Sequence, residues 1–293
     1  MNRFGNIWKF VRDLASTWNE EKPSRLAAAL AYYGMFSFVP VVYIAIRIAG
    51  IFVNDQLLSQ QIFDRLAVVL GPETANYIQD LVIATEGATT GGTLIATLVS
   101  VAALFYSASG LFTNLQYSLN TIWHVPIETQ SGFLNFIKNR LLAFILVIGV
   151  GLVLVIGAFG SMVVSVFASI LPFVIIDPDF SIIAFITLAT LLFTLIYKLL
   201  PEVDIAWRDV WLGALITSIL VSIGGWVLGF YFSVSGIGTA FEAAGALAIL
   251  LIAIYYIAQI FLSGAIFTRV YATTFGSKAD SPEDQEVVIG NPP

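Results

Sequence analysis

The chain has 293 residues, of which 58% are hydrophobic and only 11% are charged, and its mean hydropathy is +0.91. Soluble domains carry about 25% charged residues, so this composition argues against an ordinary soluble domain and indicates an integral membrane protein. The absence of cysteine excludes disulfides and thiolate chemistry, and a formal net charge of -6 gives no support to nucleic-acid binding.

Residues 1–22 are predicted to form an amphipathic helix on the inner membrane surface. Apolar residues recur there at spacings of three and four, with basic residues between them: Ile7, Phe10, Val11, Leu14 and Trp18. Because such segments bind anionic lipid surfaces, membrane lipids are the expected partner. Simple anchoring is the favoured role and regulation is the alternative. Pro23 separates this segment from a membrane domain at 23–275.

Six long apolar stretches fill most of that domain. Each reaches the roughly 20 residues that a helix needs to cross about 30 Å of hydrocarbon. They are Arg25–Val53, Gly92–Phe112, Leu141–Leu171, Ser181–Leu200, Val210–Phe232 and Ala240–Tyr271. The predicted fold is therefore an all-α, polytopic bundle of six transmembrane helices.

Two segments are predicted to lie outside these spans. In 54–91, helical apolar periodicity is broken at Gly71–Pro72 and then resumes, which predicts a pair of short helices capping the extracytoplasmic face. The segment 276–293 is rich in acidic residues and proline and poor in large apolar residues, so it is predicted to be a disordered cytoplasmic tail.

Orientation follows from the basic residues, because Lys and Arg are retained on the cytoplasmic side during insertion. With six alternating crossings, 11 of the 13 Lys and Arg residues lie on one side, and only Arg65 lies in an opposite loop. Both termini are therefore predicted to be cytoplasmic. The opposite face is predicted to be strongly acidic.

The spans carry helix-packing patterns and no catalytic motif. Small residues recur every four positions in two spans, at Gly157, Ser161, Ser165 and Ser169 and at Gly225 and Gly229. Such stripes let helices approach closely and allow a homo-oligomer. The single histidine, His124, has no second histidine or cysteine with which to share a metal. No enzyme activity, cofactor, metal or nucleic-acid partner is therefore predicted.

Several motifs carry a family resemblance between Pro23 and Ala272. They are the run Ala27–Pro40, the run Tyr106–Phe112 with Leu115, Gln116 and Trp123, then Leu200-Pro201, Trp207–Val210, Gly213-Ala214 and Leu262–Ala265. Together they resemble the YihY/virulence factor BrkB family of bacterial membrane proteins, formerly labelled ribonuclease BN. The resemblance implies a six-helix integral membrane protein in the plasma (inner) membrane of a bacterium. The chain departs from the family pattern at Glu242 and at Ile266, where a glycine and a glutamate respectively are expected.

Two function classes remain open. The favoured one is a transporter or a protein that translocates lipids or other amphiphiles, because ionisable residues within membrane spans are usually functional. The hypothetical substrate-binding residues are Arg47, Glu242, Ser37, Pro40, Asn114, Asn120 and Gln259. Arg47 and Glu242 are expected at similar depth near the outer face, beside a helix kinked or unwound at Pro40. The alternative is an envelope scaffold that assembles through its small-residue faces.

Overall fold

The computed structural model describes residues 3–50, 55–90, 110–125, 179–235 and 237–278, and every regular element in these ranges is a helix. The prediction of an all-helical chain is confirmed for this part. The helices are α1 (Arg3–Glu21), α2 (Pro23–Gly50), α3 (Asp55–Leu70), α4 (Pro72–Thr90), α7 (Asp179–Leu199), α8 (Trp207–Ser235) and α9 (Ile237–Thr274). A further helical segment occupies 110–122.

Three stretches of these helices are long and apolar enough to cross a membrane. They are Pro23–Ile44 in α2, Trp207–Ser235, which is all of α8, and Ala244–Thr274 in α9. Phe185–Leu199 in α7 is apolar but shorter. Most of the predicted span at 92–112 and all of that at 141–171 lie outside the described residues, so the number six stays a prediction.

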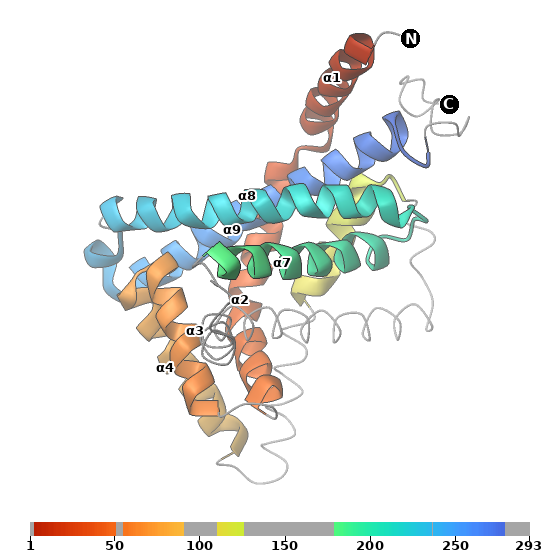
Figure 1. The fold of residues 1–293 in the computed structure, drawn as a ribbon. Coiled ribbons are helices and arrows are strands. Elements are labelled where there is room, and N and C mark those ends of the chain that lie inside the picture. The colour runs from red at the N-terminus through yellow and green to blue at the C-terminus, as the bar shows by residue number, and fades with distance from the viewer. Residues whose placement is uncertain (1–2, 51–54, 91–109, 126–178, 236, 279–293) are drawn as a thin grey trace, which may run out of the picture.

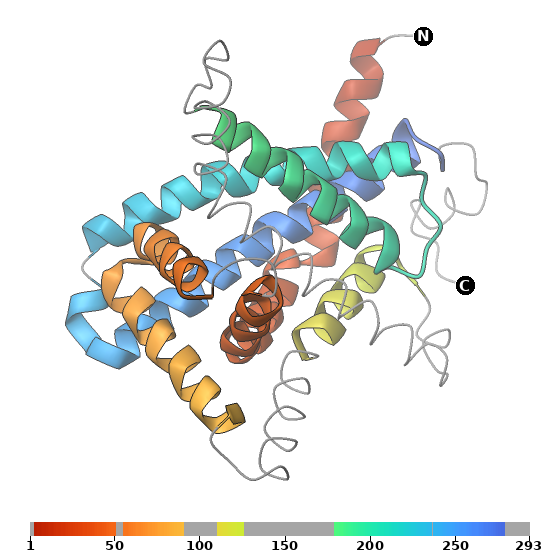
Figure 2. The same ribbon diagram turned by 60° about the horizontal axis from the view of Figure 1, so that its bottom comes forward.

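The long helix α9 is the centre of the described structure (Figures 1 and 2). It packs against α2 and α8, and α7 packs along α8 and also contacts α9, where Tyr197 Oη donates to Phe261 O. The helices α8 and α9 are antiparallel, because Gly213 of α8 faces Thr268 of α9 and Thr217 faces Gly264. These glycines leave no room for a side chain, so the two helices approach closely along one seam.

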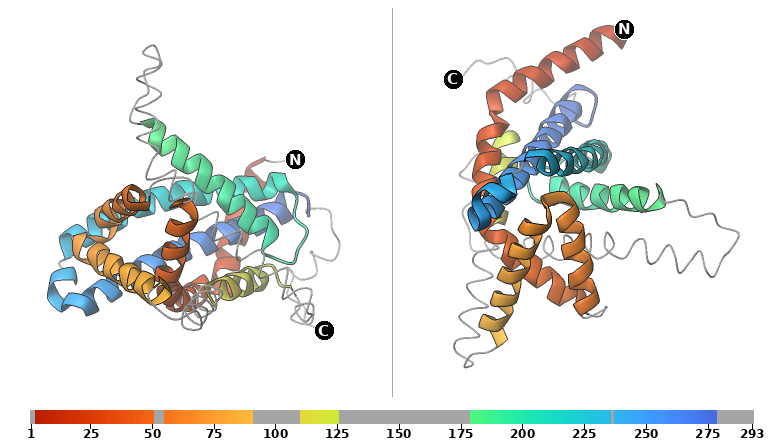
Figure 3. Two further views of the ribbon diagram at one scale, coloured as in Figure 1. Left: turned by 90° about the horizontal axis from the view of Figure 1, so that it is seen from below. Right: turned by 90° about the vertical axis from the view of Figure 1, so that its left-hand side faces the viewer.

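Two apolar clusters lie along α9. The first cluster surrounds its C-terminal half and includes Leu119, Tyr197, Val210, Leu262 and Ile266. The second cluster surrounds its N-terminal half and joins α9 to α2, α3, α4 and the end of α8; it includes Val42, Ile62, Ile78, Leu228 and Ile249. The α3–α4 pair thus packs at one end of the molecule, and α1 extends from the other (Figure 3).

Helix α1 uses its predicted lipid-facing residues in a different way. Phe10, Leu14 and Trp18 pack against the first cluster, and the Phe10 ring lies 5.4 Å from the ring of Phe267 in α9. Trp8 and Val11 remain exposed, at 73% and 51%. Because Phe10, Leu14 and Trp18 contact other helices of the protein, only the neighbouring face with Trp8 and Val11 is exposed for contact with lipid. Periodicity alone could not distinguish the two surfaces.

Pro40 does not interrupt α2, which runs as one helix from Pro23 to Gly50. The side chain is buried. Local unwinding at Pro40, one of the two predicted effects, is therefore not seen. Neighbouring helices often compensate for a proline in a membrane helix, since they pack around the distorted turn.

Candidate functional site

The predicted site residues occupy three separate helical segments. Ser37 is 1% exposed in α2, on the same helix as Pro40. Asn114 and Asn120 lie in the segment 110–122, and Gln259 lies half-buried in α9. Side-chain hydrogen bonds tie two of these residues to nearby backbone, since Asn114 donates to Gly110 O at 3.0 Å and Asn120 Oδ1 accepts from Glu202 N at 3.0 Å. Asn120 therefore holds the connection between α7 and α8.

Arg47 has a different acidic neighbour from the one that was predicted. Its Nη1 lies 3.5 Å from Glu86 Oε1 of α4, and both side chains are close to half exposed, at 47% and 49%. Glu242 lies in the second turn of α9, and its side chain is outside the described part of the structure. A pairing of Arg47 with Glu242 stays a prediction, which the charge swap Arg47→Glu with Glu242→Arg tests.

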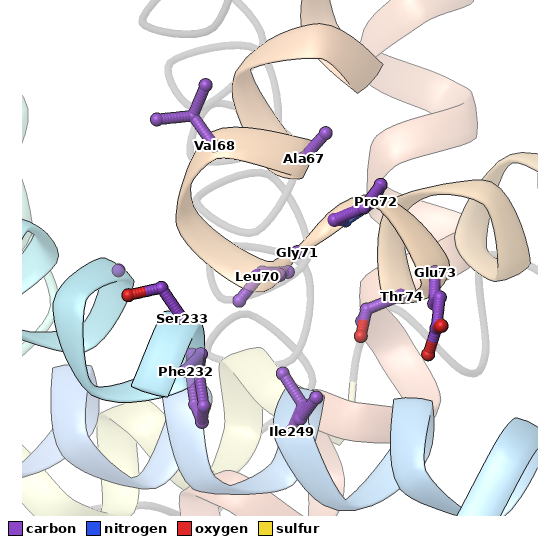
Figure 4. A pocket seen from close by; sticks show the side chains of 11 residues that line it. Ala67, Val68, Leu70, Gly71, Pro72, Glu73, Thr74, Phe232, Ser233 and Ile249 are labelled. Carbon is purple, nitrogen blue, oxygen red and sulfur yellow. The ribbon is translucent and has the colours of Figure 1, made fainter. Parts of the chain in front are cut away.

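A pocket of about 320 Å³ opens where the turn between α3 and α4 meets α8 and α9 (Figure 4). None of the predicted site residues lines it. Its walls are mainly apolar and are supplied by Ala67, Val68, Leu70, Gly71, Pro72, Gly229, Phe232 and Ile249, while Glu73, Thr74 and Ser233 add polar groups. A cavity that joins apolar walls to a few convergent polar groups is the usual form of a ligand site.

Local sequence explains how the pocket forms. Gly71 has φ 87°, a left-handed conformation that glycine adopts without strain, and it ends α3 one residue before α4 begins. Pro72 then starts α4, where its missing N–H costs nothing. Gly229 of α8 lies against the backbone of α3, where an added Cβ would be 3.4 Å from Val68 O, an ordinary contact distance.

The polar end of the pocket is formed by the first turn of α4. Thr74 is 1% exposed, and its Oγ1 has no hydrogen-bond partner among the described residues. Figure 4 shows this hydroxyl pointing toward the space above Phe232 and Ile249, with the Glu73 carboxylate beside it. The first N–H groups of a helix lack intrahelical partners, so Glu73 N–H and Thr74 N–H are further donors at this end.

A second polar cluster joins α1, the segment 110–125 and α9. Arg269 Nη1 donates to Glu21 Oε1 and to Ile122 O, both at 2.7 Å. His124 Nε2 lies 2.6 Å from the same Glu21 oxygen, so this ring nitrogen carries the hydrogen. The Glu21 and Arg269 side chains are only 7% and 14% exposed. This ion pair fixes the junction of α1 and α2 to α9.

Further polar contacts hold the same end together. Tyr197 Oη donates to Phe261 O at 2.6 Å and lies 3.1 Å from Thr217 Oγ1, which links α7, α8 and α9. Asp209, 1% exposed in the first turn of α8, accepts from Ser277 N at 2.7 Å just beyond α9. In the α7–α8 connection, a hydrogen bond from Lys198 lowers the pKa of the exposed Asp204.

Sequence reasoning missed both the pocket and the ion cluster. The Gly71–Pro72 break was recognised as a helix boundary, but nothing in the sequence showed that α8 and α9 close the space beside it. Glu21 and Arg269 are 248 residues apart, so no local pattern in the sequence pairs them. No group of three His, Asp or Glu side chains that could hold a metal occurs in the described ranges.

Helices of this length and hydropathy, packed without strands in the described part, define a helical membrane protein. The family model described as Virulence factor BrkB matches residues 14–287, and the chain belongs to this family. The resemblance seen in the sequence is thus confirmed.

Two curated bacterial relatives bear the name UPF0761 membrane protein. The chain is 23% identical over 299 residues to that of Teredinibacter turnerae and 25% identical over 277 residues to that of Saccharophagus degradans. These alignments include 97% and 92% of this chain but only 65% and 59% of the relatives' lengths. No solved structure matches the chain.

Proposed function

We propose that this protein is a multi-pass protein of the bacterial plasma membrane, with both termini cytoplasmic, that binds a membrane amphiphile and moves it between leaflets without enzymatic chemistry. The observation that carries the proposal is the pocket between the α3–α4 turn and the ends of α8 and α9. Its apolar walls, in which Leu70, Phe232 and Ile249 are buried and Val68 is 75% exposed, adjoin a polar end, as an amphiphile requires.

The position of the pocket along α8 supports this function. Phe232 and Ser233 belong to the last turn of an apolar helix long enough to span a membrane. In the predicted orientation this turn lies near the outer headgroups, while Ile249 lies deeper along α9. Each buried methylene of a ligand chain contributes about 0.8 kcal/mol, so even a short apolar contact here would provide measurable affinity.

Polar residues along the interior of the helices also favour translocation over anchoring. Ser37, Gln116 and Asn120 are each at most 8% exposed, and all three are polar groups buried in or beside apolar helices. Polar groups inside membrane helices are costly unless they hydrogen-bond, and they commonly mark substrate pathways. In this proposal they provide polar contacts away from the pocket.

The test is reconstitution of the purified chain in vesicles that contain fluorescent phospholipid, with a reductant added outside to quench the outer leaflet. Protein-dependent quenching of the inner-leaflet label is expected. Phe232→Trp should slow it, because the larger ring fills the pocket. The matched control is Phe230→Trp on the same helix, where the side chain is 64% exposed and lies outside the pocket. Equal rates for both variants would contradict the assignment.

The alternative is a scaffold that assembles into homo-oligomers. It is favoured by an exposed apolar ridge on α8, where Trp226 is 75% exposed and its ring stacks on Phe230 at 6.3 Å. Aromatic residues of this kind are enriched at protein interfaces. A Trp226→Ala variant that dissociates an oligomer, combined with no protein-dependent exchange of phospholipid, would favour this alternative.

A further inference from the structure

We infer that the pocket at the first turn of α4 binds the headgroup of a zwitterionic phospholipid that carries a primary amine. The inference rests on the proposed function, since it names the class of amphiphile that the pocket accepts. It assigns the phosphate to Thr74 and the neighbouring backbone N–H groups, and the ammonium to Glu73.

The phosphate position follows from the unpaired donors. Thr74 Oγ1 is buried without a partner among the described residues and points into the pocket. A buried hydroxyl without a hydrogen bond is unfavourable, so a ligand acceptor in this place would satisfy it. The N-terminus of the 19-residue helix α4 adds free N–H groups and a positive dipole end. Together these groups form an anion-binding arrangement.

The ammonium position follows from the charge beside it. Glu73 is exposed at the rim of the same pocket, one residue before Thr74. A purely anionic headgroup would bring its charge close to this carboxylate. The helices α3 and α4 carry Asp55, Asp64, Asp80 and Glu86 in addition, against Arg65 in the same helices and Arg47 of α2 beside Glu86. A zwitterion avoids this repulsion, because its ammonium can bind Glu73 while its phosphate binds Thr74.

The apolar walls account for the lipid chain. Phe232 and Ile249 are buried and lie below the polar end, and Leu70 forms the opposite wall. At about 320 Å³ the pocket is at the small end of the range for ligand sites. It therefore fits a headgroup and the first part of a chain, and the rest of the lipid would remain in the bilayer.

Native mass spectrometry of the full chain in detergent tests this inference with three added lipids: phosphatidylethanolamine, phosphatidylcholine and phosphatidylglycerol. Phosphatidylethanolamine is expected to bind best, because phosphatidylcholine has no N–H donor and phosphatidylglycerol has no cation. Glu73→Gln should reduce this preference by about threefold, as expected for one exposed ion pair. The control Asp80→Asn, on the same helix outside the pocket, should leave it unchanged.

The isosteric variant Thr74→Val should weaken binding of all three lipids by about tenfold or more, the loss expected for one hydrogen bond to a charged group. Thr187→Val is its control, because Thr187 is exposed on α7 and bonds only its own helix backbone. Phosphoethanolamine, which has no chains, should compete weakly. Equal competition by this soluble compound would overturn the assignment to a lipid.

The outcomes separate the two proposals. Phosphatidylethanolamine binding that depends on Glu73 and Thr74, without any exchange of phospholipid between leaflets, would support this site and contradict the proposed function. Exchange that is slowed by Phe232→Trp but does not depend on the headgroup, Glu73 or Thr74 would support the proposed function and contradict this headgroup site. Preferential binding of phosphatidylglycerol would overturn the inference directly.

Discussion

The seam between α8 and α9 makes a sharp prediction for Gly264→Ala. A Cβ at Gly264 would overlap Thr217 Oγ1 and would lie 2.7 Å from Tyr197 Oη and 3.0 Å from Thr217 Cβ. These atoms belong to buried side chains on two other helices, so they cannot move into solvent. The substitution must therefore separate α8 from α9 or displace the Tyr197 hydroxyl from its hydrogen bonds.

The expected cost follows from opposing contributions. Overpacking of a buried site costs about 1–3 kcal/mol, and loss of one Tyr197 hydrogen bond costs about 1 kcal/mol more. The higher helix propensity of alanine offsets about 1 kcal/mol. A net loss of about 1–3 kcal/mol in the free energy of unfolding is expected. At Gly225 no heavy atom of the described residues lies within 4 Å of the added methyl, so Gly225→Ala should be neutral or stabilising.

The assay is reversible unfolding in mixed micelles, followed by the fluorescence of the six tryptophans. Gly264→Ala should unfold at a lower denaturant fraction than Gly225→Ala. Adding Thr217→Ala to Gly264→Ala removes the overlapping hydroxyl. In this double-mutant cycle the second substitution should restore part of the lost free energy of unfolding. If both glycine variants are equally stable, or if Thr217→Ala only lowers the stability further, the close packing of α8 against α9 at Gly264 is contradicted.

Three other predictions concern charged and exposed positions. Arg269→Gln removes the cation beside the buried Glu21 carboxylate and leaves it only the His124 N–H among the described residues, so it should cost up to about 3–5 kcal/mol in the same unfolding assay, whereas an unchanged midpoint would refute the buried ion pair. Because the chain has no native cysteine, Asp80→Cys should react with impermeant maleimide added to intact cells and Ser277→Cys should not; labelling of position 277 would reverse the orientation. A double-mutant cycle between Arg47 and Glu86 should give a coupling of no more than about 1 kcal/mol, and a larger value would mean that the pair is desolvated.

Helix boundaries and long apolar helices were predictable because their signals lie in neighbouring residues. The described structure has helices on either side of Gly71–Pro72, where loss of periodicity predicted a break, and a new helix begins at Pro23. Lys22, just before it, has φ 47°, which a sequence cannot show. Apolar length likewise predicted the helices that contain the three described candidate spans.

Contacts between distant helices could not be predicted in this way. The Gly225–Gly229 stripe suggested a packing seam, yet a Cβ at Gly225 would meet no described atom within 4 Å, and Gly229 lies against α3. The tight α8–α9 seam uses Gly213 and Gly264 instead, each opposite a threonine. Spacing identifies small residues on one face of a helix, but the partner depends on the packing of the whole bundle. The pocket beside Thr74 was missed for the same reason.

The most direct measurement of the central claim is the rate at which fluorescent phosphatidylethanolamine exchanges between leaflets in vesicles with and without the purified protein. The proposed function predicts exchange that rises in proportion to the protein-to-vesicle ratio and that Phe232→Trp reduces toward the protein-free rate. A rate equal to that of protein-free vesicles, from wild-type protein with a native unfolding midpoint, would contradict translocation and leave the scaffold as the better account.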